Sequence, residues 1–206
     1  MSVLSTPSFI PFPLLDLSQE IPTLLVQQKY ATSDNFTGTP APDYKTLRPM
    51  ARREMVDILK RATRELEQEG YSLVLFDAFR PETTIQYFVE WAKQPENNPI
   101  LKERFYPRLQ KAQLLEDGYI SPVSPHGQGL AVDVTLAYQG IPLVMGTGFD
   151  FFDLLSHTDD VNIPLTCQDN RKLLKSFLER HGLKNYRKEW WHFSLRLCSY
   201  QIKRAF

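Results

Sequence analysis

Apolar residues recur at helical spacing over residues 50–69. Met55, Leu59 and Leu66 fall on one side of a helix, and charged residues occupy the other side. Gly70 stands where a helix would end, because glycine readily adopts the left-handed backbone of a C-terminal cap. The pattern predicts an amphipathic helix over residues 50–69.

Two further segments show the same period. Residues 81–93 begin with Pro81, which suits the first turn of a helix, and the prolines that follow the segment end it and open a loop. Residues 170–180 carry an apolar stripe, with Asn170 as a candidate N-cap and Gly182 beyond the end. We therefore expect a helix in each segment.

Strand patterns lie between these helices. Residues 71–79 form a short apolar run typical of a buried strand, and residues 130–136 alternate, with Asp133 on the opposite face from Val132 and Val134. Residues 190–197 read as a last strand. The order predicts an α+β fold: one domain with a small, mainly antiparallel sheet flanked by helices.

The first part of the chain shows little periodicity. Residues 1–47 are rich in Pro, Thr and Asp and predict loop with short strands. We expect residues 1–29 to be an N-terminal extension that packs on a domain formed by residues 30–206.

Composition narrows the partners and the compartment. The 206 residues include 24 basic and 24 acidic side chains, so no charge excess points to nucleic acid as a partner. No apolar run is long enough to span a bilayer. Prolines interrupt the N-terminal apolar stretch and no basic residue precedes it, so we expect a cytoplasmic protein, or a periplasmic one if a leader was removed. Cys167 and Cys198 are expected to be free thiols.

Two histidines lie in unusual surroundings. His126 stands in a loop between Pro125 and Gly127, seven residues before Asp133. A carboxylate in an apolar strand is costly when buried without a partner, and a cation would compensate it. The alternative is a surface histidine and an aspartate on a solvated strand face, and spacing alone leaves both interpretations open.

The second histidine, His192, follows Glu189 and two tryptophans. Residues three apart on a regular strand point to opposite faces. Glu189 and His192 therefore share one site only if the chain bends between them. The tryptophans are expected to pack in the core or to line a pocket.

Together, His126, Asp133 and His192 offer two imidazoles and one carboxylate. Three protein ligands with one open position are typical of catalytic zinc, and this donor set leaves manganese, iron and cobalt open. We expect the metal site to lie at the sheet.

Arg80 closes the strand at residues 71–79. A guanidinium fixed there can stabilise a carbonyl oxygen as it gains charge. The alternative is a structural arginine that pairs with Asp77. His157 and His181 are expected to be structural.

Several segments together carry a resemblance to a known family; they are FDAFRP at 76–81, SPHGQGLAVD at 124–133, EWWHF at 189–193, YATSDNFTG at 30–38 and MGTGFDFFDLLSH at 145–157. In their order along the chain, these segments resemble the D-alanyl-D-alanine dipeptidases, the VanX-type zinc peptidase family. The resemblance runs from about residue 30 to residue 193.

The resemblance implies a role for each matching residue. His126, Asp133 and His192 match the zinc ligands, with one zinc ion per chain. Glu189 matches the general base, and Arg80 the arginine that stabilises the transition state. Two further residues match substrate contacts: Ser124 near the carboxylate end, and Asp150 at the free amino group.

The implied reaction is hydrolysis of the dipeptide D-Ala-D-Ala, in cell-wall peptide metabolism or vancomycin resistance. The expected partner is this small substrate, and the oligomeric state stays open. Two alternatives remain: a related zinc D,D-carboxypeptidase or endopeptidase acting on longer peptidoglycan peptides, and a zinc-stabilised binding domain without catalysis.

Overall fold

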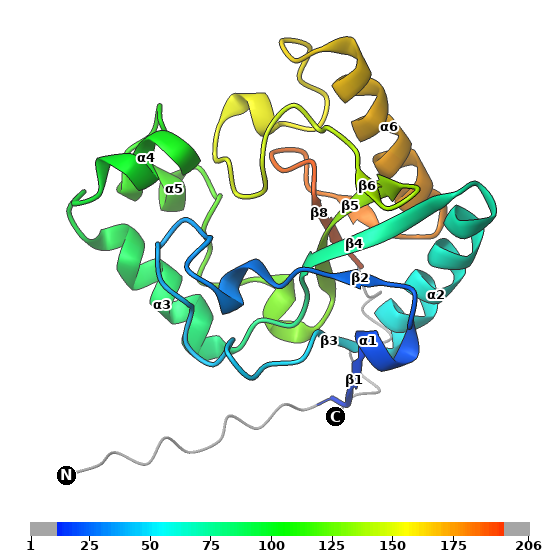
Figure 1. The fold of residues 1–206 in the computed structure, drawn as a ribbon. Coiled ribbons are helices and arrows are strands. Elements are labelled where there is room, and N and C mark those ends of the chain that lie inside the picture. Colours follow the sequence, from blue (N-terminus) through cyan, green and yellow to red (C-terminus); the bar gives the residue numbers. More distant parts are fainter. Residues whose placement is uncertain (1–11, 196–206) are drawn as a thin grey trace.

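A computed structural model describes residues 12–195 of the protein (Figure 1). The strands are β1 (Leu14–Asp16), β2 (Leu25–Val26), β3 (Met50–Arg52), β4 (Tyr71–Asp77), β5 (Ala131–Tyr138), β6 (Ile141–Pro142), β7 (Lys184–Asn185) and β8 (His192–Ser194). The α-helices are α1 (Leu17–Glu20), α2 (Arg53–Gln68), α3 (Glu82–Lys93), α4 (Pro99–Phe105), α5 (Lys111–Glu116) and α6 (Leu165–Arg180). Short 3₁₀ helices are η1 (Lys29–Ala31), η2 (Pro125–Gln128) and η3 (Leu154–Ser156).

The central sheet has the strand order β2-β4-β5-β8-β7, and β6 pairs with the end of β5. The β2–β4 pairing is parallel, and the other pairings of this sheet are antiparallel. A separate two-stranded sheet joins β1 and β3. The expected α+β class, with a small and mainly antiparallel sheet flanked by helices, is confirmed.

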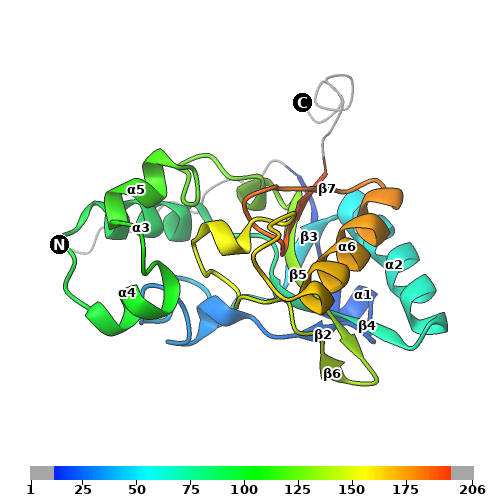
Figure 2. The same ribbon diagram turned by 90° about the horizontal axis from the view of Figure 1, so that it is seen from above.

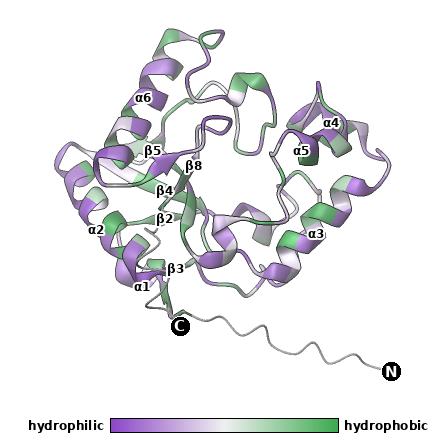
Figure 3. Ribbon diagram, turned by 180° about the vertical axis from the view of Figure 1, so that it is seen from behind, coloured by the Kyte–Doolittle hydropathy of each residue, from purple (hydrophilic) through white to green (hydrophobic). Residues whose placement is uncertain are grey.

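Helices lie on both sides of the central sheet. In Figure 1 and in the perpendicular view of Figure 2, α2 and α6 lie on one side of the sheet, and α3, α4 and α5 lie on the other. Figure 3 shows apolar residues along β4 and β5, while α2 and α6 alternate between apolar and polar surfaces. The main core therefore forms where the apolar stripes of these two helices cover the sheet.

Both long helices differ from their expected bounds. Residues 50–52 form β3, which pairs with β1, so the first long helix begins at Arg53. The last helix begins at Leu165 with Pro164 as its N-cap residue, so Asn170 is inside the helix and is not its cap. The strand expected over residues 190–197 begins at His192, because Trp190 and Trp191 lie in a turn; residues 196 and 197 are outside the described part.

A register shift in the sheet matters for the site. Leu75 pairs with Val134, but Asp77 pairs with Asp133, so β4 has one extra residue, Phe76. This β-bulge places Asp77 directly opposite Asp133. On the other side of β5, Asp133 pairs with His192 of β8. Three polar residues therefore lie side by side across three neighbouring strands.

The N-terminal residues that the structure describes contribute to the fold. Leu17, Ile21 and Leu24 are buried in the core, and β2 forms one edge of the central sheet. The division of the chain at residue 30 stays a prediction. Cys167 is free and buried, as expected, whereas Cys198 lies outside the described residues. None of the helices within residues 12–195 is long and apolar enough to cross a membrane.

Candidate active site

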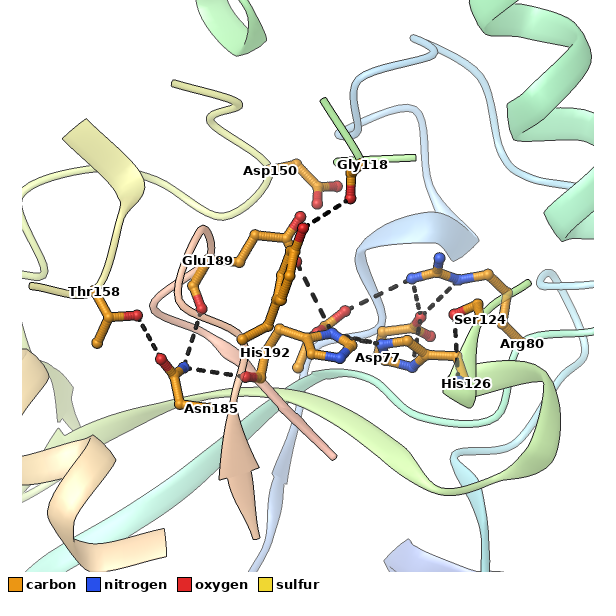
Figure 4. A network of polar contacts seen from close by, with 12 residues as sticks. Asp77, Arg80, Gly118, Ser124, His126, Asp150, Thr158, Asn185, Glu189 and His192 are labelled. Carbon is orange, nitrogen blue, oxygen red and sulfur yellow. Dashed lines mark hydrogen bonds and ion pairs between the residues drawn. The ribbon is translucent and has the colours of Figure 1, made fainter. Parts of the chain in front are cut away.

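Two histidines and one aspartate converge at the central sheet, where β4 ends and β8 begins. His126 belongs to η2, Asp133 to β5 and His192 to β8. His126 Nε2 lies 3.1 Å from His192 Nδ1, and Asp133 Oδ1 lies 3.3 Å and 3.0 Å from these two nitrogens. Figure 4 shows the two imidazole rings side by side, joined through these nitrogens. The structure thus brings together the three residues that the sequence singled out.

The loop around His126 fixes how its ring is presented. His126 Nδ1 donates a hydrogen bond of 2.6 Å to the carbonyl oxygen of Ala78. Because Nδ1 carries the proton, Nε2 carries the lone pair on the side of the ring that lies toward Asp133. Gly129 ends η2 with φ +65°, and a Cβ there would lie 2.7 Å from Leu14. The turn that returns the chain from His126 into β5 therefore requires glycine at this position.

A tight turn brings Glu189 and His192 to the same site. The His192 amide donates to the Glu189 carbonyl at 3.2 Å, which closes a four-residue turn around the two tryptophans. The Asn185 side-chain amide donates to the carbonyls of both Glu189 and His192, each at 3.1 Å. The bend that the spacing requires is therefore present, and Asn185 stabilises it.

Glu189 is 7% exposed, and its Oε2 lies 3.9 Å from His192 Nδ1. Burial raises the pKa of its carboxyl group well above the usual value, and the nearby charges of Asp133 and Asp150 add to this shift. Burial also acts to raise the pKa of Asp133, but His126 and His192 outweigh it and hold that pKa well below its usual value. The two carboxyl groups therefore differ strongly in proton affinity.

The donor set fits a metal ion. Ligand atoms from His126, Asp133 and His192 lie within 4.8 Å of one another. Two imidazole nitrogens and a carboxylate oxygen that converge so closely repel one another when none carries a proton. A divalent cation between them would use all three lone pairs, and nitrogen and oxygen donors of this kind suit zinc.

Arg80 follows β4 and lies beside this cluster. Its guanidinium donates to Asp77 Oδ2 from Nε at 3.1 Å and from Nη2 at 2.8 Å. The pairing with Asp77 that the sequence left as an alternative is therefore formed. Arg80 Nη2 also lies 3.6 Å from Asp133 Oδ2, and Arg80 lines the same pocket as the histidines, so it stays within reach of the site.

Asp150 is buried in the same pocket. Its Oδ1 accepts a hydrogen bond of 3.2 Å from the Tyr30 hydroxyl, and its Oδ2 has no hydrogen-bond partner among the described residues. Burial raises the pKa of Asp150, and the charge of Asp133 adds to the effect. The residue also has φ +58°, a backbone conformation that aspartate adopts more readily than most residues. A cationic ligand group would give Oδ2 the partner that it lacks.

The pocket that joins these residues has a volume of 590 Å³. Ser124 lies in its wall, and its hydroxyl caps η2 by accepting from the His126 amide. At the rim, the Tyr186 hydroxyl donates to the Gly118 carbonyl at 3.2 Å, and the Tyr186 ring lies 5.9 Å from the His192 ring. Small peptides have dimensions that fit a cavity of this size.

Several residues of the site were not singled out by the sequence patterns. Tyr30 lies within a recognised motif, but Asn185 has no local signal, because its role depends on a turn formed later in the chain. The other two histidines lie outside the ligand cluster. His157 Nε2 lies 3.1 Å from the Tyr119 hydroxyl, and His181 Nε2 lies 2.9 Å from Glu65.

The chain is similar in sequence to known peptidases. The sequence profile of the peptidase M15 family, described as D-Ala-D-Ala dipeptidase, matches residues 12–203. A D-alanyl-D-alanine dipeptidase of Enterococcus faecium is 39% identical over 171 residues, which cover 82% of this chain and 84% of the relative. One from Streptomyces coelicolor is 36% identical over 170 residues, with 82% and 84% covered. Among solved structures, a vancomycin-resistance D,D-pentapeptidase VanY variant in complex with Zn(II) matches with 14% identity and a TM-score of 0.43, covering 78% of this chain and 80% of that one.

Proposed function

The chain belongs to the D-alanyl-D-alanine dipeptidase family of M15 peptidases, and we propose that it is a zinc-dependent enzyme that hydrolyses D-Ala-D-Ala. The observation that carries the proposal is the convergence of His126, Asp133 and His192 beside the buried carboxyl group of Glu189. We propose cell-wall peptide metabolism, including vancomycin resistance, as the setting of this reaction.

The three converging residues would hold one zinc ion per chain. Zinc held there would supply Lewis-acid chemistry that polarises the carbonyl group of the scissile bond. The tautomer of His126 supports this assignment. Its Nδ1–H donates a hydrogen bond to the Ala78 carbonyl, so its Nε2 is available as a metal ligand.

Glu189 is suited to be the general base. Burial raises the pKa of its carboxyl group toward neutral pH. A base with a pKa near the working pH both accepts and returns a proton effectively. In the proposed reaction, Glu189 takes a proton from the attacking water molecule and delivers it to the leaving amine. Burial keeps bulk water from competing for that proton.

Arg80 and Asp150 are suited to contact the substrate. Within the described residues, Nη1 of Arg80 makes no hydrogen bond, so it is available to the oxygen that becomes negative in the transition state. The unpartnered Oδ2 of Asp150 would accept the substrate ammonium group. Ser124 lies in the same pocket and would meet the carboxylate end.

A dipeptide is favoured over longer peptides by the burial of Asp150. A peptide extended at its amino end would place a neutral amide near this carboxylate, and the carboxylate would then stay buried without a partner, which is costly. This distinguishes the proposal from a carboxypeptidase or endopeptidase that acts on longer wall peptides.

The test combines metal analysis with activity. The purified protein should contain close to one zinc ion per chain, release D-alanine from D-Ala-D-Ala, and lose this activity with a chelator. Glu189→Gln should retain zinc and lose about 10²-fold to 10⁴-fold in kcat. The surface variant Glu67→Gln, on the exposed side of α2, is the matched control and should behave like the parent.

Three outcomes would count against the proposal. Faster cleavage of a pentapeptide ending in D-Ala-D-Ala than of the dipeptide would favour the longer-peptide alternative. Bound zinc without hydrolysis of either substrate would favour a binding domain. Unchanged turnover in Glu189→Gln would remove Glu189 from the role of base.

A further inference from the structure

The bulge in β4 creates an unfavourable contact at the candidate metal site. With an unshifted register, Phe76 would face Asp133, but the extra residue places Asp77 there. Asp77 is fully buried and Asp133 is 3% exposed. Like charges directly opposite each other on neighbouring strands are destabilising, so two buried aspartates in this position need a compensating partner.

His126 and Arg80 both lie beside the two aspartates, but Arg80 does not interact equally with them. Its Nη2 lies 2.8 Å from Asp77 Oδ2 and 3.6 Å from Asp133 Oδ2. Its Nε adds a second hydrogen bond to the same oxygen of Asp77. The guanidinium is therefore bonded to Asp77 and held just outside hydrogen-bond distance of Asp133.

Asp77 is itself held in place. The Tyr44 hydroxyl donates to its Oδ1 at 2.7 Å, while the two bonds from Arg80 reach Oδ2. All three hydrogen bonds are donated to Asp77, which is what an acceptor-only carboxylate requires. Figure 4 shows Asp77, Arg80 and His126 grouped at one side of the site. Neither Asp77 nor Tyr44 belongs to the cluster that could hold the metal.

We propose that Asp77 is a positioning residue that holds Arg80 away from Asp133, which leaves the Asp133 carboxylate free for the metal and keeps Arg80 aimed at the substrate. This inference rests on the proposed function. Without the charge on Asp77, Asp133 becomes the nearest anion to Arg80. Arginine and carboxylate pair strongly, so the guanidinium would move onto Asp133 and compete with the metal for its oxygens.

If Asp77 acts through Arg80, then the effect of Asp77 on zinc affinity should depend on the presence of Arg80. Zinc affinity is measured by competition with a chromophoric chelator in the parent, Asp77→Asn, Arg80→Met and the double variant. Asp77→Asn should bind zinc about 10-fold to 100-fold more weakly, which is the usual range for residues that support a ligand. In the Arg80→Met background, the same substitution should cause no further loss.

Kinetics give a second readout. Asp77→Asn at saturating zinc should lower kcat while leaving KM nearly unchanged, because the misplaced Arg80 is missing mainly from the transition state. Asp57→Asn, an exposed residue of α2, is the matched control. Tyr44→Phe keeps the charge of Asp77 but removes one of its hydrogen bonds, and it should weaken zinc binding by a smaller factor.

Unchanged zinc affinity in Asp77→Asn would overturn the proposal, as would an equal loss in both backgrounds, which indicates a general structural role. If Asp77→Asn does not fold, Tyr44→Phe decides: unchanged zinc affinity in that variant overturns the proposal. Failure of the parent to hydrolyse D-Ala-D-Ala would instead contradict the proposed function, and the zinc titrations would still report on Asp77.

Discussion

The acidic residues of the pocket differ because their neighbours differ. Asp133 has two imidazoles beside it, and these hold its pKa low despite burial. Glu189 and Asp150 are buried near other carboxylates, so burial and like charge raise both of their pKa values. The same side-chain chemistry therefore suits a metal ligand, a base and an ammonium acceptor at neighbouring positions.

At this scale we predict that Asp150→Asn weakens recognition of the substrate amino group. Asparagine tolerates the positive φ of this position, so the backbone should be retained. Losing a hydrogen bond to a charged group costs about 1.5–3 kcal/mol, so kcat/KM for D-Ala-D-Ala should fall about 10-fold to 100-fold. With N-acetylated D-Ala-D-Ala, which has no ammonium group, the parent and the variant should differ little. A similar loss on both substrates would contradict the assignment.

Most of the candidate site could be predicted from the sequence, because its residues occur in short motifs. What the motifs could not show is the set of contacts between distant segments. Tyr44 lies 33 residues from Asp77, and Thr158, whose hydroxyl donates to Asn185, lies 27 residues away from it. Such pairs depend on how the strands align, and no local spacing reports that alignment.

Among the elements, strands β4 and β5 and the middle part of each long helix followed the hydrophobic pattern. The ends did not. Residues 50–52 suit a helix locally, but pairing with β1 gives them a strand conformation. Helices α4 and α5 fall in a segment rich in proline and charge, where the apolar period is too short to detect. Tertiary contacts decide the structure in both cases.

Arg171 of α6 shows how one helix holds the loops of the site in place. Its buried guanidinium donates to the carbonyls of Met145, Leu155 and His157 at 2.7–2.8 Å. It also donates to the Thr147 hydroxyl, which accepts from the indole of Trp190 as well. Through Arg171, helix α6 therefore connects two segments of the site: the loop that contains Asp150 and the turn that contains Glu189.

We predict that Arg171→Met destabilises the fold. Three carbonyls, that of Met145 in a buried bond and those of Leu155 and His157 in partly buried bonds, would lose their donor at a cost of about 1–3 kcal/mol each, so the total should be about 3 kcal/mol or more. For a chain of this length the thermal midpoint should fall by on the order of 10 °C. The neighbouring Lys172→Met is the matched control, because Lys172 is exposed. A midpoint within 2 °C of the parent would show that these bonds contribute little (about 1 kcal/mol or less).

At the scale of the molecule, the pocket concentrates buried acidic groups, and this affects stability when the metal is removed. The pKa of Glu189 in the folded protein is above its ordinary value of 4.5. The folded state then binds more protons than the unfolded chain, so this group's contribution to stability is full below pH 4.5 and is lost as pH rises through the folded pKa.

We therefore predict that, after chelation, Glu189→Gln is more stable than the parent at pH 8 and that this difference shrinks at pH 5. Urea unfolding of both proteins at the two pH values measures it. Added zinc should stabilise the parent, because a ligand that binds the folded state alone shifts the equilibrium toward it. An equal difference at both pH values would show that the ionisation of Glu189 is not its cause.

The single extra residue in β4 has a consequence for how this sequence can change over time. Side chains alternate along a strand, so losing or gaining one residue between Tyr71 and Leu75 would exchange the faces of the strand residues on one side of the change. Substitutions within the strand leave the alternation of its side chains unchanged. We expect a deep mutational scan to find β4 tolerant of conservative apolar exchanges, yet intolerant of in-frame codon deletions or insertions between Tyr71 and Leu75, including those at positions whose side chains never reach the pocket.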